Sequence, residues 1–230
     1  MKKCLLSALL FLLGNAAFSQ TSGDYNYSIA VRGYSLMQMP KVLNQRNSEK
    51  FREAAFSGGI LKFNDNQISY RLGGNYFKKN VQIVNNCLNC EEANGKMTDY
   101  SFKIGFEKNI NFSIIQPYFG FDIGYRNNKF VGMLSTKSSR DALAVAIVPG
   151  PDGVETSKSG FTASPILGIK VNPMPQITLF VESNLEFFYS YERQETAGPD
   201  QARTFKKFNK SEFLMNPVSI GLQINLGTNR

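Results

Sequence analysis

The chain of 230 residues contains no histidine, which narrows the chemistry open to its other polar side chains. Histidine is the usual general base beside a serine or cysteine nucleophile, so triad-type hydrolases are excluded. A hydrolase with paired carboxylates remains, and Glu182 and Glu186 are the pair to consider. On a strand they would share a face but lie about 13 Å apart at ~3.3 Å per residue, which is wider than such hydrolases use. We therefore expect no catalytic site and assign both carboxylates to ion pairs.

Two cysteines, Cys87 and Cys90, form a Cys-Leu-Asn-Cys motif in a polar segment. In an exported protein such a pair favours a small disulfide, with free or labile thiols as the alternative. A redox motif of the thioredoxin type needs a βαβ context, which the surrounding sequence does not provide. A zinc site would need two further ligands. We expect a structural disulfide, no metal and no cofactor.

Residues 1–19 have the pattern of a secretory signal peptide. Lys2 and Lys3 precede an apolar run over 5–13, and Ala17-Phe18-Ser19 is a small-x-small cleavage site before Gln20. The apolar run is shorter than the ~20 residues of a spanning helix. We expect a signal peptide over 1–19 and one barrel domain over 20–230.

The rest of the chain is dominated by alternation of apolar and polar residues. A period of two with one apolar face is the pattern of a half-buried strand. Such segments are predicted at 24–37, 51–63, 67–78, 98–108, 114–127, 160–171, 176–190 and 211–227. The segment 51–63 alternates least clearly, because Phe56 and Ile60 compete with Leu61 and Phe63 for the apolar face.

The connections between these strands alternate in length. Short turns fall at 64–66, 109–113 and 172–175, and long polar loops are expected at 79–97, 128–159 and 191–210. Tight turns on one side and extended loops on the other are typical of outer-membrane barrels. The predicted fold is all-β, an eight-stranded antiparallel up-and-down transmembrane β-barrel.

The polar faces favour a membrane barrel over a soluble one. They carry charges of both signs, which can pair with one another across a narrow eight-strand lumen. The predicted lumen charges are Arg32, Arg71, Lys103, Asp122, Lys170, Glu182 and Glu186. Aromatic residues expected near strand ends, as in interfacial girdles, are Tyr25, Tyr27, Tyr76, Tyr100, Tyr125, Phe161, Phe187 and Tyr189.

The net charge of +8 comes from scattered basic residues. With no dense basic patch and a leader for export, the charge fits anionic lipid headgroups, and no nucleic-acid partner is expected.

Two segments carry a family resemblance. Residues 117–125 (PYFGFDIGY) and 217–222 (PVSIGL), together with the leader, are similar to the small OmpA- and OmpX-like eight-stranded proteins of the outer-membrane β-barrel family. The resemblance covers about 24–227 and implies location in the outer membrane, contact with its lipid, and insertion by the barrel-assembly machinery. The chain ends Gly227-Thr228-Asn229-Arg230, without the terminal aromatic residue of many such barrels.

We therefore predict a non-enzymatic outer-membrane barrel of a Gram-negative envelope. Its role would be structural or in surface interaction, with an extracellular or envelope partner meeting the extended loops. One alternative is a narrow porin-like pore or small-solute transporter lined by Arg32, Arg71, Lys103 and Lys170. A further alternative is a soluble, secreted ligand-binding barrel. The sequence names no ligand, partner or oligomeric state.

Overall fold

The computed structural model describes residues 25–42, 51–65, 67–84, 91–110, 114–136, 152–197 and 203–228. The expected signal peptide over 1–19 and the pair Cys87 and Cys90 lie outside these ranges. The described residues include no helix long and apolar enough to cross a membrane.

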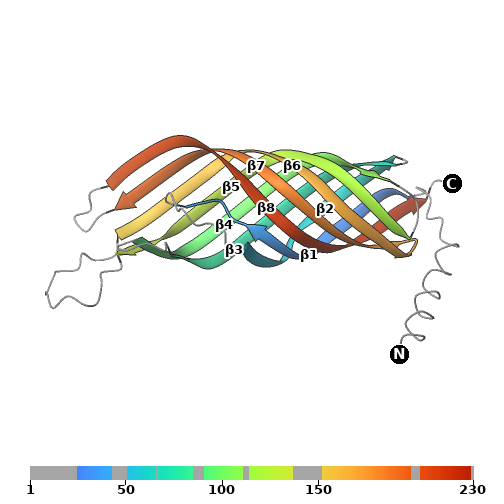
Figure 1. The fold of residues 1–230 in the computed structure, drawn as a ribbon, viewed down its shortest axis with the longest axis horizontal. Helices are drawn as coiled ribbons and strands as arrows, with labels where there is room; N and C mark the ends of the chain where they lie inside the picture. Colours follow the sequence, from blue (N-terminus) through green and yellow to red (C-terminus); the bar gives the residue numbers. More distant parts are fainter. Residues whose placement is uncertain are drawn as a thin grey trace, which may run out of the picture.

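The described residues form a closed barrel in which every strand is antiparallel to its sequence neighbours and β8 returns to pair with β1 (Figure 1). Closure gives the strands hydrogen-bonding neighbours on both sides, which is the condition for a sheet in lipid. The predicted fold class is confirmed. The strands are β1 (Tyr25–Gln38), β2 (Phe51–Asp65), β3 (Ile68–Val84), β4 (Glu91–Asn109), β5 (Ile115–Thr136), β6 (Asp152–Met174), β7 (Ile177–Ala197) and β8 (Arg203–Thr228).

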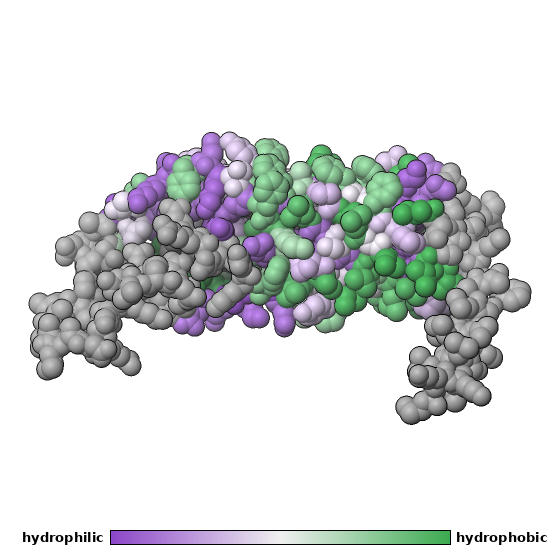
Figure 2. Space-filling model, viewed as in Figure 1, coloured by the Kyte–Doolittle hydropathy of each residue, from purple (hydrophilic) through white to green (hydrophobic). Residues whose placement is uncertain are grey.

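Apolar side chains face outward in the part of the barrel near the short turns. Phe102 and Leu179 are 58% and 48% exposed, whereas Arg71 and Glu182 are 2% and 1% exposed. Figure 2 shows the apolar residues gathered over the end of the barrel where β1 begins and β8 ends, and polar residues toward the opposite end. This apolar belt with a charged interior is the arrangement of a membrane barrel, and it is the reverse of a soluble ligand-binding barrel.

The strands are longer than the sequence predicted, and the expected loops at 79–97, 128–159 and 191–210 were wrong over most of their length. β3 continues to Val84, β5 continues to Thr136 and β8 already begins at Arg203. Most of the aromatic residues expected at strand ends, such as Tyr100 and Tyr125, therefore lie well inside their strands, whereas Tyr25 and Tyr27 lie at the start of β1.

The reason is a change in which face is apolar. Beyond Tyr76, Phe77 and Val81 of β3 point inward and are buried, whereas Lys78 and Asn80 point outward and are exposed. The period of two continues in β3, but its apolar residues have moved from the outer to the inner face. The part of the barrel beyond this change of face, on the side away from the short turns, is named the outer extension. It has an apolar core of its own, formed by Met39, Val42, Ala54, Phe77, Val81, Ala93, Met97, Phe130, Leu134 and Val154.

Each strand has an exposed aromatic residue toward the boundary between the apolar belt and the outer extension. They are Tyr34, Phe56, Tyr76, Tyr100, Tyr125, Phe161, Tyr189 and Phe213. Several are direct ladder partners, including Tyr76 with Tyr100, and Tyr125 with Phe161 and Phe161 with Tyr189.

A β-bulge places Phe56 in this set and explains the unclear alternation of 51–63. The β1–β2 register shifts between Arg32 and Tyr34. Phe56 has φ of 49° and is 80% exposed, while Ala54 and Ser57 on either side both face inward. The extra residue changes the face on which the following side chains fall, so neither phase describes the whole strand.

On the inner face of the barrel, at the level of the apolar belt, the packing around Gly221 leaves no space for a side chain. A Cβ there would meet the ring of Phe180 and the carbonyl of Val31, whereas a Cβ on Gly74 would meet no described atom within 4 Å. We expect Gly221→Val to lower the free energy of unfolding by roughly 1–3 kcal/mol through overpacking. Gly74→Val should be close to neutral. Urea unfolding of both variants in lipid vesicles measures the difference, and equal effects would contradict the packing described.

Candidate functional site: the charged interior

All seven predicted lumen charges lie inside the barrel. The structure leaves each of them at most 7% exposed and takes them from six strands: Arg32 (β1), Arg71 (β3), Lys103 (β4), Asp122 (β5), Lys170 (β6), and Glu182 and Glu186 (β7). Two further residues, Lys62 and Glu107, complete the set near the short turns. Glu107 lies on the polar face of the strand predicted over 98–108, so the alternation there could have identified it as a lumen charge. Lys62 could not be assigned to a face, because the bulge in β2 interrupts the alternation of its strand.

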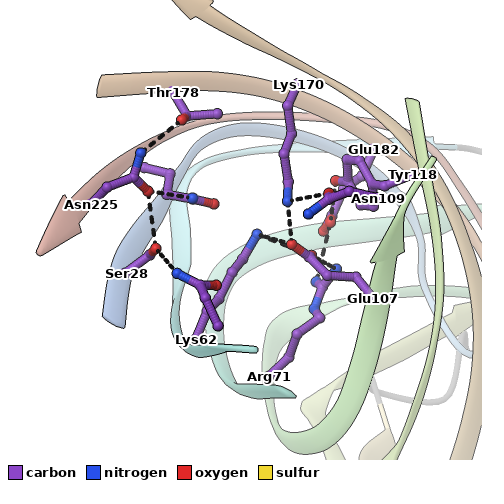
Figure 3. Close-up of polar contacts among 12 residues, drawn as sticks. Ser28, Lys62, Arg71, Glu107, Asn109, Tyr118, Lys170, Thr178, Glu182 and Asn225 are labelled. Carbon is purple, nitrogen blue, oxygen red and sulfur yellow. Dashed lines mark hydrogen bonds and ion pairs between the residues drawn. The ribbon is translucent and has the colours of Figure 1, made fainter. Parts of the chain in front are cut away.

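Glu107 of β4 is the centre of an inner cluster (Figure 3). Its carboxylate accepts hydrogen bonds from Lys62 Nζ at 2.9 and 3.0 Å and from Arg71 Nη1 at 3.0 Å. Lys170 Nζ of β6 also donates to it, at 2.5 Å. One carboxylate therefore joins side chains from β2, β3 and β6 across the barrel.

Arg71 extends this cluster to a second carboxylate. Its Nη2 donates to Glu182 Oε2 at 3.1 Å, and Arg32 Nη2 donates to Glu182 Oε1 at 2.7 Å. The hydroxyl of Tyr118 also donates to Glu182, at 3.1 Å. The Tyr118 ring lies beneath Lys170, with Nζ 4.9 Å from its centroid. Glu107 and Glu182 are thus joined through one guanidinium in the middle of the lumen.

A second cluster lies further along the barrel and is centred on Glu186. Lys103 donates to one oxygen of this carboxylate, and Arg126 Nη1 donates to the other at 2.5 Å. Arg126 Nε also pairs with Asp99 at 2.9 Å, and Asn128 donates to the same Asp99 carboxylate at 2.7 Å.

A third cluster lies in the outer extension. Lys158 is fully buried and pairs with Glu192 at 3.0 Å and with Glu212 at 3.2 Å. Lys210 makes a further ion pair with Glu212 at 3.2 Å.

Between the inner and second clusters lies a cavity of about 50 Å³. It is lined by Arg32, Ser35, Met37, Ser57, Asn75, Asp99, Ser101, Lys103, Asp122, Arg126, Asn184, Glu186, Asn216 and Ser219. Charged and amide groups predominate, so the space suits water or a small polar solute and disfavours an apolar one.

The chemistry of this interior is charge compensation. An isolated charge in a low-dielectric interior costs several kcal/mol or more, so each ion needs an opposite partner and further hydrogen bonds. Glu107, Glu182 and Glu186 each contact two or more basic groups. Among the described residues, no group of three or more Cys, Asp or Glu side chains is placed to hold a metal ion.

The barrel is similar to solved outer-membrane proteins in architecture. No protein-family model matches the sequence, and no curated protein is significantly similar to it. Among solved structures, the chain is similar to the outer membrane protein OprG from Pseudomonas aeruginosa. The TM-score is 0.54, the identity 10%, and the match covers 90% of this chain and 100% of OprG. It is also similar to a major outer membrane protein from Thermus thermophilus, with TM-score 0.50, 10% identity, and 87% and 99% coverage.

The fold is that of an outer-membrane β-barrel. At 10% identity the likeness is one of architecture, so the role of this barrel has to be argued from its own side chains.

The inner cluster of this outer-membrane-type barrel makes a direct prediction. Glu107→Gln removes the charge shared by Lys62, Arg71 and Lys170 and leaves buried cations undercompensated. We expect it to lower the free energy of unfolding by roughly 3–5 kcal/mol. Glu155 serves as the control, because its pair with Lys129 at 2.6 Å is exposed on both sides. Glu155→Gln should cost about 1 kcal/mol or less. Urea titrations of the two variants in lipid vesicles measure both effects, and a Glu107 variant as stable as the control would show that the cluster contributes little.

Proposed function

We propose that the chain is a non-enzymatic β-barrel of the Gram-negative outer membrane, with a closed lumen and a structural or surface-interaction role. In this role the apolar belt anchors the protein in lipid and the outer extension meets the outside. Insertion by the barrel-assembly machinery and an extracellular or envelope partner belong to the same proposal.

The observation that carries it is the continuous ion-pair network across the lumen. Arg32, Glu182, Arg71 and Glu107 link β1, β7, β3 and β4 in one chain of contacts, to which Lys62 and Lys170 add β2 and β6. An eight-strand interior is just wide enough for side chains to fill. We infer that these contacts block solute flow.

The alternative of an anion-selective pore requires basic side chains free to meet a passing anion. Arg32, Arg71, Lys103 and Lys170 all contact carboxylates instead. Their charge is compensated within the wall, which supports a closed barrel over a cationic pore.

The outer extension supports the surface role. Several of its outward side chains are basic, including Lys78, Lys96, Lys129 and Arg193, whereas its interior holds the apolar cluster and the buried ion pairs of Lys158. An inverted alternation of this kind suits strands that stand in water beyond the lipid. The basic outer face suits an anionic envelope partner rather than nucleic acid, because in the proposed orientation this face points away from the cell interior.

Location is tested by membrane fractionation with a gel assay. The mature protein should be recovered with outer membranes and should migrate differently before and after boiling, because a closed barrel resists detergent until heated. Recovery in the aqueous fraction without detergent, or migration that heating does not change, would contradict the proposal.

The closed lumen is tested by planar-bilayer conductance. The wild-type protein should show no large stable openings. Arg71→Ala should introduce openings, because it disconnects Glu107 from Glu182 at the centre of the network. Lys78→Ala, an outward substitution on the same strand, should remain silent. Large stable channels in the wild-type protein would favour the pore.

A further inference from the structure

The ends of β1 and β2 leave the barrel ladder before the neighbouring strands end. β1 pairs with β8 as far as Leu36 and Val218, and β2 pairs with β3 as far as Gly58 and Asn75. Above these points, among the described residues, β8 and β3 continue in the ladder with β7 and β4 on one side alone. Residues 37–42 and 51–57, here named the β1–β2 tip, therefore sit between two strand edges, beyond the last ladder pairs of β1 with β8 and of β2 with β3.

Side chains tie the tip to these edges. Gln38 Oε1 accepts from the backbone N–H of Met215 on β8 at 3.0 Å, and the N–H of Lys41 donates to Glu212 at 3.3 Å. On the other edge, Arg52 Nη2 donates to the carbonyl of Gln82 on β3 at 3.2 Å. Single side-chain bonds of this kind are weaker in sum than a continuous ladder, because each must order a flexible side chain.

The inward side chains of the tip pack into the apolar core of the outer extension. Met39 and Val42 are 6% and 1% exposed and belong to the same apolar cluster as Phe77 and Phe130 of the wall. The sulfur of Met39 also accepts a hydrogen bond from Arg126 Nη2 at 3.8 Å. The tip is thus held inward chiefly by burial of a few apolar side chains.

Irregular backbone lies at the base of the tip. The register of β1 shifts between Arg32 and Tyr34 against both of its neighbours, and Phe56 takes its positive φ in the same region of β2. A third shift lies nearby between β7 and β8, at Glu182 and Asn184. Bulges interrupt ladder bonds and bend strands, so a tip that moves would turn about this level.

The cavity lies at the same level. Ser35, Met37 and Ser57 line it from the base of the tip, and the Arg32–Glu182–Arg71 contacts lie on its inner side. Two buried acceptors in its wall, Asp122 Oδ1 and Asn216 Oδ1, find no hydrogen-bond partner among the described residues. Asp122 is 5% exposed, and its oxygen lies 3.6 Å from Arg71 Nε, too far for a hydrogen bond.

We propose that the β1–β2 tip is a hinged flap over a binding site for a small hydrogen-bond-donating solute, of the primary ammonium class, that enters from outside. Such a ligand would supply hydrogen-bond donors to Asp122 Oδ1 and Asn216 Oδ1, the two acceptor atoms that have no hydrogen-bond partner among the described residues. The volume of about 50 Å³ admits a few waters or one small solute. The inner cluster stays closed beneath it, so the site binds without passing its ligand through the barrel. Binding at this site does not depend on whether the lumen conducts; that the ligand stays above the inner cluster rests on the closed lumen proposed above.

The test uses a cysteine in the cavity wall as a reporter. Ser219→Cys is introduced with Cys87→Ser and Cys90→Ser, because Ser219 lines the cavity and is 4% exposed. The protein in lipid vesicles is treated with 2-aminoethyl methanethiosulfonate, a small ammonium reagent, and the modification rate is followed by mass spectrometry. Heat-modifiable migration confirms that each variant is folded.

A looser flap should expose the reporter more often. Val42→Ser removes a buried apolar contact of the tip and should raise the modification rate by about tenfold or more. Gln38→Ala, which removes one tie and leaves the apolar core intact, should raise it less. Val131→Ser is the matched control, because Val131 is 45% exposed on the outer face of β5, and it should leave the rate unchanged. Equal rates in all variants would overturn the flap.

The ligand class is tested by the charge of the reagent. Relative to the same Ser219→Cys variant unfolded in urea, the cavity cysteine should react faster with the ammonium reagent than with the sulfonate analogue, 2-sulfonatoethyl methanethiosulfonate. A preference for the sulfonate, or no preference, would overturn the assignment of the ligand class.

Discussion

Charge compensation in a space too narrow for bulk water is the constraint on which this structure depends. Closing eight strands into a ring brings their inward faces within reach of one another, and ions there lose most of their hydration. Glu107, Glu182 and Glu186 solve this by each contacting cations from several strands. Because each carboxylate is shared, the clusters bind strands that are far apart in sequence. The same contacts that compensate the charges also fill the lumen.

The length of the strands follows from two surroundings rather than one. In the part near the short turns the outside is apolar and the inside is ionic. In the outer extension Phe77, Val81 and Phe130 lie inside with the ion-paired Lys158, and Lys78, Lys96 and Lys129 lie outside. The same β-ladders thus run from a part with an apolar outer face, as in a membrane barrel, into a part with an apolar interior, as in a soluble barrel. The exposed aromatic residues, found on each strand, accompany the transition, which fits their preference for interfaces.

Much of the fold could be predicted from the sequence because the pleat has a strict period of two. The segment over 98–108, for example, assigned Lys103 inward and Phe102 outward, as the structure shows. Strand ends were mispredicted where the apolar residues changed face, since a pattern sought on one face stops there. Lys62 was missed because the bulge at Phe56 breaks the parity of its strand. The pairing of Glu107 with β2, β3 and β6, and the inward fold of Met39 and Val42, depend on closure in three dimensions, which local alternation does not encode.

The bulge at Phe56 has a consequence for how this wall tolerates variation in length. One additional residue there keeps Ala54 inside while also keeping Leu61 and Phe63 outside. Deleting a single residue at this point would turn the preceding side chains of β2 to the opposite face of the sheet. Arg52 and Ala54 would then point outward instead of inward. A substitution at this position should therefore disturb the strand less than the insertion or deletion of one residue. This segment should tolerate changes of residue type better than changes of length.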